Sequence, residues 1–345
     1  MKNAPVLFVG LLLAFTLAPR IELRAAAATK APPNSSASDS SLAQLRTTAE
    51  LGDAMAQSRL GDRYESEGFE PEALKWHQKA ADQGDAVAQF KLGCRYLLGI
   101  GLIKDEAAAV NWYRKAAHQG HVRSQEALGS LHLLGKAVPK DEAAAVAWFR
   151  KAADQGARSA QYNLGAMFRS GRGVPKDEVA AVSWFRQAAD QGFGPAQYNL
   201  GFMYGSGRGV PMDDAVAVSW FQKAADQGYA VGQYNLAAMY ASGRGVPMND
   251  AVAVSWYQKA ADQGYVLAQY NLGFMYASGK GVPKSLVDAY AWFNLAASIG
   301  DKVADEIRGR LERKMSYEDV VQAQHLSLEL DQRITGKPIF FPGDN

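Results

Sequence analysis

The sequence predicts an all-α protein built as an array of antiparallel helix pairs, on three observations. All seven tryptophans lie 36 residues apart, from Trp76 to Trp292. Leu-Gly, Ala-Ala and Gln-Gly pairs recur with the same period. Each period holds two segments with helical spacing of apolar residues, separated by a turn containing Gly and Pro. A fixed period of this length is typical of repeat proteins, whose units stack to bury one continuous core.

The N-terminus predicts a secretory signal peptide over residues 1–28. Lys2 provides a basic start, and Val6–Ala18 is an uncharged apolar run that is short for a membrane span. Ala25–Ala28 offers an Ala-x-Ala cleavage site, with no nearby cysteine for a lipid anchor. Three charged residues between the apolar run and the alanines are unusual, so an uncleaved anchor is the alternative. We expect a periplasmic or secreted protein.

Two short segments are predicted to precede the repeats. Residues 29–41 are rich in Ser, Ala and Pro, which indicates a flexible linker. Residues 42–52 are predicted to form an N-terminal capping helix. The seven repeats then follow at residues 53–84, 85–120, 121–156, 157–192, 193–228, 229–264 and 265–300.

The repeat at 157–192 illustrates the helix pair. Apolar residues at spacings of three and four predict a first helix over 157–170 and a second over 177–191. The Gly-Arg-Gly-Val-Pro turn at 171–175 separates them, because Gly ends a helix and Pro prevents its resumption. The first repeat lacks four residues of this turn. Trp and aromatic pairs such as Trp184-Phe185, Trp220-Phe221 and Trp256-Tyr257 are expected to fill the space between neighbouring helices, and one such side chain is worth about 2–3 kcal/mol if fully buried.

The combined pattern resembles the Sel-1-like repeat family, a relative of the tetratricopeptide repeats. The resemblance rests on Ala-Gln-Tyr-Asn-Leu-Gly, Gly-x-Gly-Val-Pro and Trp-Phe/Tyr-x-Lys-Ala-Ala-Asp-Gln-Gly in register over residues 53–300. It implies a right-handed α-solenoid that acts as a scaffold or adaptor for other proteins. Residues 301–345 resemble the family's usual ending, with a helix holding Ile307 and Leu311 and another that begins near Ser316.

Composition narrows the function classes. The formal charge of +2 falls to zero once Lys2, Arg20, Glu22 and Arg24 leave with the signal peptide, which argues against nucleic-acid binding. Cys94 is the sole cysteine, so no intramolecular disulfide forms, and we expect it to be a packed residue.

No nucleophile motif, phosphate loop or zinc-binding motif is present, so no enzymatic activity, cofactor or metal is expected. His118 and His121 straddle the turn between two repeats. We expect them to be solvated turn residues rather than metal ligands.

The first helices carry a row of aromatic residues two positions before the Leu-Gly pair. The repeat frame places this position on the concave surface, and two phenylalanines follow two positions after the Leu. The set is Tyr162, Tyr198, Tyr234, Tyr270, Phe202 and Phe274. We expect an aromatic groove suited to an extended peptide or a partner helix. The alternative is that the Tyr-Asn-Leu-Gly sequence serves the repeat frame alone.

A basic residue recurs at the centre of five turns. The row consists of Lys136, Arg172, Arg208, Arg244 and Lys280. Stacked turns would space these cations about 10 Å apart, close to the Debye length, so the row is a candidate for attracting an acidic partner or polyanion. The alternative is a set of solvated turn residues, with nearby carboxylates (Asp177, Glu178, Asp213 and Asp214) partly cancelling the field.

These features predict a non-enzymatic adaptor that binds a protein partner in the groove of the solenoid. The alternative is a polysaccharide- or peptidoglycan-associated protein of the cell envelope, which would use stacked aromatic rings and the basic row. Nucleic acid is not an expected partner, and a membrane is one only if the signal sequence stays uncleaved.

Overall fold

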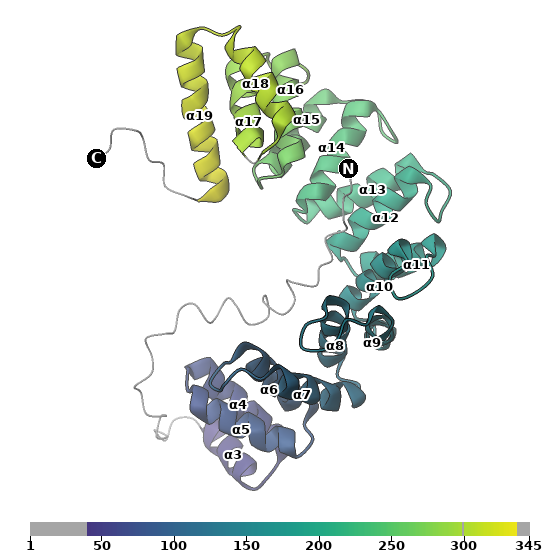
Figure 1. Ribbon diagram of the computed structural model, residues 1–345, viewed down its shortest axis with the longest axis vertical. Helices are drawn as coiled ribbons and strands as arrows, with labels where there is room; N and C mark the ends of the chain where they lie inside the picture. Colours follow the sequence, from purple (N-terminus) through teal and green to yellow (C-terminus); the bar gives the residue numbers. More distant parts are fainter. Residues whose placement is uncertain (1–39, 299, 337–345) are drawn as a thin grey trace, which may run out of the picture. The chain divides into compact units, whose positions relative to one another are not determined.

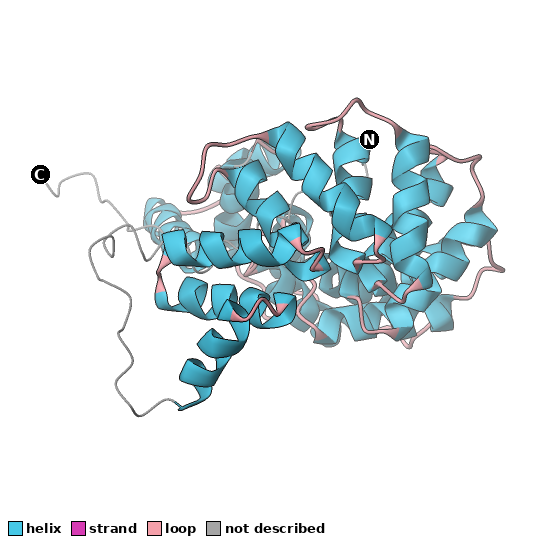
Figure 2. Ribbon diagram, turned by 90° about the horizontal axis from the view of Figure 1, so that it is seen from below, coloured by secondary structure: helices cyan, strands magenta, loops and turns pink. Residues whose placement is uncertain are grey.

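The structure is a computed structural model, and it describes residues 40–298 and 300–336. The predicted signal peptide and residues 29–39 lie outside the described residues, as do residues 337–345. Regular secondary structure in the described residues is entirely helical, and Figure 2 shows helices joined by loops. This confirms the predicted all-α class. None of the described helices is long and apolar enough to cross a membrane.

Seventeen helices follow one another in the described part of the chain (Figure 1). They are α3 (Ser40–Glu50), α4 (Ala54–Glu67), α5 (Glu70–Asp82), α6 (Ala86–Leu98), α7 (Glu106–His118), α8 (Val122–Leu134), α9 (Glu142–Asp154), α10 (Arg158–Ser170), α11 (Glu178–Asp190), α12 (Gly194–Ser206), α13 (Asp214–Asp226), α14 (Ala230–Ser242), α15 (Asp250–Ala261), α16 (Val266–Ser278), α17 (Leu286–Ser298), α18 (Lys302–Glu312) and α19 (Tyr317–Thr335).

The described residues form two compact units, which divide after Trp184 inside α11. In the first unit α4 packs on α5, α6 on α7 and α8 on α9, and each second helix also packs on the first helix of the next repeat. In the second unit α12 pairs with α13, α14 with α15 and α16 with α17 by the same rule. Successive packed helix pairs are therefore the building principle of both units, as the sequence predicts.

Within a repeat, the Gly of the Leu-Gly pair lets the two helices approach closely. A Cβ atom at Gly129 would lie 2.8 Å from the ring of Phe149, and one at Gly273 would lie 2.9 Å from Phe293. Phe149 and Phe293 are both fully buried. The ring that follows the Trp is thus the centre of each helix pair.

The tryptophans differ from the expected continuous core. Trp220 and Trp292 are buried, with 9% and 2% exposure, whereas the other five are partly exposed at the edges of the core clusters. A lysine three residues later often lies over the indole ring, as Lys115 lies 3.9 Å from the ring centre of Trp112. This arrangement follows from helix geometry, since the ring one position further along turns into the helix pair and the Trp turns to its rim.

The turn inside each repeat reaches back to the preceding repeat. Gly173 and Gly245 both have φ 69, and a Cβ at either would overlap backbone atoms of Glu142 or Asp214 at the start of the previous second helix. Both the positive φ and the close approach require glycine there. Ala137 occupies the same position of the third repeat with φ 62, a conformation that L residues disfavour.

Two glutamines bond to each other within a repeat, and one of them also bonds to the backbone of the preceding repeat. Gln119 Nε2 donates to Gln89 Oε1 at 2.8 Å, and Gln89 Nε2 donates to the backbone oxygen of Ala81 at 3.1 Å. The same pair of bonds recurs from Gln155 to Gln125, from Gln227 to Gln197 and from Gln263 to Gln233. Since the accepting glutamines are buried, these bonds satisfy polar groups inside the stack.

The last repeat marks the end of this glutamine ladder. Gln269 Oε1 is buried and has no hydrogen-bond partner among the described residues. One period after Gln263 the sequence has Ile299, which carries no amide to donate. The C-terminal helices α18 and α19 both pack on α17. The predicted start of α19 at Ser316 is confirmed, because Ser316 Oγ accepts from the backbone N–H of Asp319 at 3.1 Å and so caps the helix.

Candidate functional site

In the second unit, each predicted tyrosine lies between two other aromatic rings. Tyr234 lies 5.7 Å from the buried ring of Tyr257, in the same repeat, and 5.1 Å from Tyr265, which opens the next repeat. Tyr198 repeats the pattern at 6.1 Å from both Phe221 and Tyr229. These tyrosines therefore support the repeat frame, and they also stay partly exposed.

The third tyrosine of this unit lies at the C-terminal repeat. Tyr270 lies 4.9 Å from Phe274 and 5.6 Å from the buried Phe293. Phe274 is 44% exposed, an unusual state for a large apolar side chain in a helix that packs on two others. Phe202 occupies the equivalent position of α12 and is also partly exposed.

An aromatic residue replaces the usual N-cap at the start of these first helices. Asp53 and Asp85 accept a hydrogen bond from the backbone at the starts of α4 and α6. At the starts of α12, α14 and α16 the same position holds Phe193, Tyr229 and Tyr265, which make no side-chain capping bond. Loss of such a cap costs about 0.5–2 kcal/mol. The second unit forgoes this stabilisation three times and gains a partly exposed ring each time.

The first helices of the repeats in the second unit also contain no charged residues. The sequences of α12, α14 and α16 contain no Asp, Glu, Lys, Arg or His, whereas α4, α6, α8 and α10 all carry charged side chains. We call the resulting surface the aromatic face, formed by Tyr198, Phe202, Tyr229, Tyr234, Tyr265, Tyr270 and Phe274. Burial and the neighbouring Tyr198 and Tyr234 raise the pKa of Tyr265 to about 12, so its hydroxyl stays neutral.

Tyr162, the remaining predicted tyrosine, belongs to the first unit. It is only 5% exposed, so it offers little ring surface to a ligand. The equivalent residue of the second repeat is Phe90, which lies 5.1 Å from the ring of His121. His121 is not a solvated turn residue as predicted, because its Nδ1 accepts from the backbone N–H of Ser124 and caps α8.

Two of the predicted basic residues are held in ion pairs with the preceding repeat. Arg172 donates from Nε and Nη2 to Glu142 Oε1 at 2.9 and 2.7 Å, and Arg244 Nη2 lies 2.6 Å from Asp214 Oδ1. Hydrogen bonds from Arg172 and then Lys140 lower the pKa of Glu142. The predicted partial cancellation by carboxylates thus occurs at Arg244.

The other members of the basic row have different surroundings. The guanidinium carbon of Arg208 lies 5.6 Å from the ring centre of Phe202, a cation–π contact at the edge of the aromatic face. Lys136 and Lys280 are exposed.

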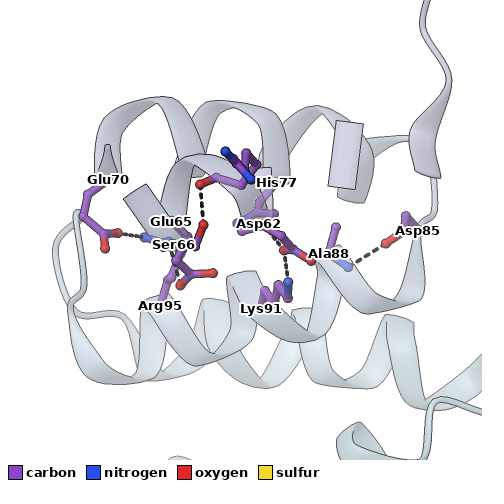
Figure 3. A network of polar contacts seen from close by, with 10 residues as sticks. Asp62, Glu65, Ser66, Glu70, His77, Asp85, Ala88, Lys91 and Arg95 are labelled. Atoms are coloured by element: carbon purple, nitrogen blue, oxygen red, sulfur yellow. Dashed lines mark hydrogen bonds and ion pairs between the residues drawn. The ribbon is translucent and has the colours of Figure 1, made fainter. Parts of the chain in front are cut away.

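A polar cluster in the first two repeats is the feature that sequence reasoning missed (Figure 3). His77 is fully buried on α5, where the third and fifth repeats have Phe149 and Phe221, and its Nε2 lies 2.9 Å from Asp62 Oδ1. Lys91, from the next repeat, also pairs with Asp62. Burial, and next the charge of Arg95, lower the pKa of His77 to about 4, so the ring is neutral near pH 7.

Arg95 is the second centre of this cluster. It is 3% exposed, and it binds Glu70 Oε2 at 2.7 Å through Nη1 and Glu65 Oε1 at 3.1 Å through Nη2 (Figure 3). Glu65 and Glu70 belong to the first repeat and Arg95 to the second. Arg95 therefore joins these repeats in the place where later repeats use a turn arginine.

A family model settles the relationship that the repeat geometry suggests. The Sel1 repeat model matches residues 54–85, 86–121, 122–156, 158–193, 194–229, 230–265 and 266–301. The chain belongs to the Sel1 repeat family. Sel1 repeats form helical scaffolds that mediate protein interactions. No curated protein matches the chain.

A solved structure of a Sel1 repeat protein agrees with this assignment, and a second is similar in sequence. A Sel1 repeat protein from Oxalobacter formigenes is 37% identical with a TM-score of 0.66, over 78% of this chain and 79% of that one. A protective antigen of uropathogenic Escherichia coli strains with an SLR fold is 27% identical with a TM-score of 0.40, over 88% of this chain and 84% of that one.

The polar cluster departs from the Sel1 repeat pattern in a way that raises the question of a metal site. Donor atoms of Asp62, Glu65 and His77 lie within 4.8 Å of one another. The carboxylates are already compensated, Asp62 by Lys91 and Glu65 by Arg95. His77 Nδ1 is buried without a hydrogen-bond partner among the described residues, whereas a metal-binding histidine normally donates that second N–H. The cluster therefore fits an ion-paired junction between Sel1 repeats one and two better than a metal centre.

Cys94, next to Arg95 in the sequence, lies in the buried core of repeats two and three. It is 5% exposed, and the hydroxyl of Tyr113 donates to its Sγ at 3.4 Å. Burial raises the pKa of the Cys94 thiol to about 11, which keeps it protonated. The packed residue expected from the sequence is what the structure contains.

Proposed function

We propose that the protein is a non-enzymatic interaction scaffold that binds an extended, largely uncharged segment of a protein partner on the aromatic face of repeats five to seven. The observation that carries the proposal is the run of three successive first helices without a charged residue, each with partly exposed aromatic rings. Membership of a family that mediates protein interactions supports it.

The chemistry of the aromatic face suits a segment of this kind. Aromatic rings on helices offer large contact areas with little side-chain freedom to lose, and such rings dominate the binding energy of many interfaces. An uncharged surface adds no cost for desolvating charges, but it gives a charged ligand no partner. A segment with apolar and aromatic side chains is therefore favoured over a strongly acidic or basic one.

We also propose that the protein acts in the periplasm or outside the cell. The support is the sequence of residues 1–28, with its basic start, apolar run and Ala-x-Ala site. A lone cysteine is compatible with an oxidising compartment because no disulfide pair is required.

The alternative of a cell-envelope glycan binder depends on the basic row. Arg172 and Arg244 are engaged with carboxylates of the preceding repeats, which reduces the positive field that an anionic polymer would meet. The adaptor proposal needs no basic row, so the observed pairs favour it.

The test is a selection of peptides from a displayed library against the purified chain, followed by affinity measurements. Replacing Tyr198, Tyr234 and Tyr270 with Ala removes three anchors, each worth at least about 1 kcal/mol, so the selected peptides should bind at least about 100-fold more weakly. Phe274→Ser is a milder variant, because this ring is 44% exposed and contributes less to the frame.

A matched control removes rings outside the aromatic face. Tyr96→Ala, Phe168→Ala and Tyr317→Ala together should leave peptide affinity unchanged, with helical content checked by circular dichroism in every variant. Equal binding by the control and by folded variants of the aromatic face would refute the proposal.

A further inference from the structure

The end of α19 lies next to the aromatic face. Arg333 Nη2 binds Asp262 Oδ1 at 2.6 Å, and a Cβ atom on Gly264 would lie 3.4 Å from Ile334 Cγ2. Gly264 directly precedes Tyr265, a member of the aromatic face. The helix ends at Thr335, with Gly336 as its left-handed cap at φ 69. The chain therefore leaves α19 within a few residues' reach of Tyr265.

The sequence after this point has the chemistry that the aromatic face favours. Residues 337–342 read Lys-Pro-Ile-Phe-Phe-Pro, with three large apolar side chains and no charge after Lys337. The two prolines restrict φ and favour an extended, polyproline-like backbone. Extended segments containing proline are recognised on surfaces lined with aromatic side chains.

The length of this segment matches the spacing of the face. Six residues at about 3.1 Å each extend about 19 Å, while neighbouring helices pack about 10 Å apart. A segment that starts beside Tyr265 in the seventh repeat therefore reaches the rings of the sixth, Tyr229 and Tyr234. Tyr234 and Tyr265 are only 5.1 Å apart, so one phenylalanine can contact both.

We propose that residues 338–342 dock in cis on the aromatic face, with Phe340 and Phe341 against Tyr265 and its neighbours, and that a partner segment binds by displacing them. This inference rests on the proposed function of the aromatic face. It adds that residues 338–342 cover the face when no partner is bound. The docked segment lowers the affinity of the full chain for a partner and shields the apolar rings from unspecific contacts.

The test uses chymotrypsin cleavage of the native full chain at the Phe340–Phe341 bond, followed by mass spectrometry. The double variant Tyr229→Asp, Tyr265→Asp removes two rings of the face and restores the capping residue found at Asp53 and Asp85, so its first helices stay folded. We expect cleavage at least about tenfold faster in this variant than in the wild type. Ala157→Asp adds the same cap to α10 and should leave the cleavage rate unchanged.

Equal cleavage rates in wild type and double variant would overturn the proposal. Protection that increases with protein concentration would also overturn it, because the occupant would then be the tail of a second copy.

A second measurement separates this inference from the proposed function. A labelled peptide with the sequence of residues 337–342 is titrated into the full chain and into the variant Phe340→Ser, Phe341→Ser, whose face is vacated. We expect at least about tenfold tighter binding by the variant. Equal, measurable binding by both chains would overturn cis docking and leave the aromatic face as a peptide site. Binding by neither would overturn cis docking and remove this support for the face as a site for apolar peptides.

Discussion

Replacing His77 with Phe should remove a specific acid sensitivity of the first repeat. His77 is fully buried, and its Nε2 binds Asp62 while Nδ1 has no partner among the described residues. The third repeat has Phe149 in the same position against the equivalent glycine, so the phenylalanine ring fits the site. The substitution leaves Asp62 paired with Lys91.

The magnitude follows from the pKa of His77. Its folded value of about 4 lies below the ordinary value of 6.5, because burial and Arg95 disfavour the imidazolium. Below pH 6.5 His77 is therefore protonated in the unfolded chain but stays neutral in the folded chain. The free energy of unfolding consequently falls as the pH drops from 6.5 towards 4. The full difference between the folded and unfolded pKa values corresponds to about 3 kcal/mol of folding stability, of which about 2 kcal/mol is lost by pH 5.

Hydrogen exchange of α4 and α5 amides at pH 7 and pH 5 measures this effect, since exchange reports the local opening free energy of one region. The carboxylates near the ring, Glu65, Glu70 and Asp85, are present in both proteins, so their contributions cancel in the comparison. The wild type should lose about 2 kcal/mol more than His77→Phe between the two pH values. A loss of equal size in both proteins would refute a buried neutral histidine.

Three further substitutions, two of them with a matched control substitution, test the packing of the repeats, each measured by urea unfolding against the wild type. Gly129→Ala should destabilise the chain by about 1–3 kcal/mol, because the new Cβ would lie 2.8 Å from Phe149. Gly205→Ala, whose new Cβ has its nearest neighbour at 3.4 Å, should instead stabilise the chain by up to about 1 kcal/mol through helix propensity. A change of the same sign in both variants would contradict the argument from close approach. Ala137→Gly should stabilise by about 1 kcal/mol because φ is 62 there, and a loss of stability would show that this turn is not strained. Gln119→Ala should lower the free energy of unfolding by about 1–3 kcal/mol, because it leaves Gln89 Oε1 buried without its donor. Gln78→Ala removes an exposed bond to Asp82 and should lower it by less than about 0.5 kcal/mol. Equal losses would show that the glutamine ladder does not stabilise the stack.

The helices could be predicted because their signals are local. The first helix of the fourth repeat is predicted at 157–170 and observed at Arg158–Ser170, and the second is predicted at 177–191 and observed at Glu178–Asp190. Gly171 ends the first with a positive φ, and Asp177 caps the second by accepting from the N–H of Ala180 at 2.9 Å. Such end signals depend on residues a few positions apart.

Contacts between residues far apart in the sequence do not follow from the same reasoning. The glutamine ladder joins side chains 30 residues apart, so the period reveals that both glutamines recur but not that they bond to each other. The polar cluster left a signal in the sequence, since His77 departs from the aromatic residue of the other repeats. Its partners Asp62, Lys91 and Arg95 come from two repeats and are identified only by the packing.

The candidate site was predicted in part. The period predicts the tyrosine row. The difference between the charged first helices of the first unit and the uncharged helices α12, α14 and α16 gains meaning only with the partial exposure of the rings. The aromatic residues at the N-cap positions of α12, α14 and α16 replace a stabilising cap, and identifying them requires the exact helix starts.

Site-specific photo-crosslinking tests the proposed role of the aromatic face most directly. A photoreactive phenylalanine replaces Phe274 on the face or, as a control, the 84% exposed Tyr317 on α19, in the full chain expressed in its native host. If the face binds a protein partner, Phe274 should crosslink one and Tyr317 should not. Crosslinking of the same protein at Tyr317 and not at Phe274 would contradict the role of the aromatic face.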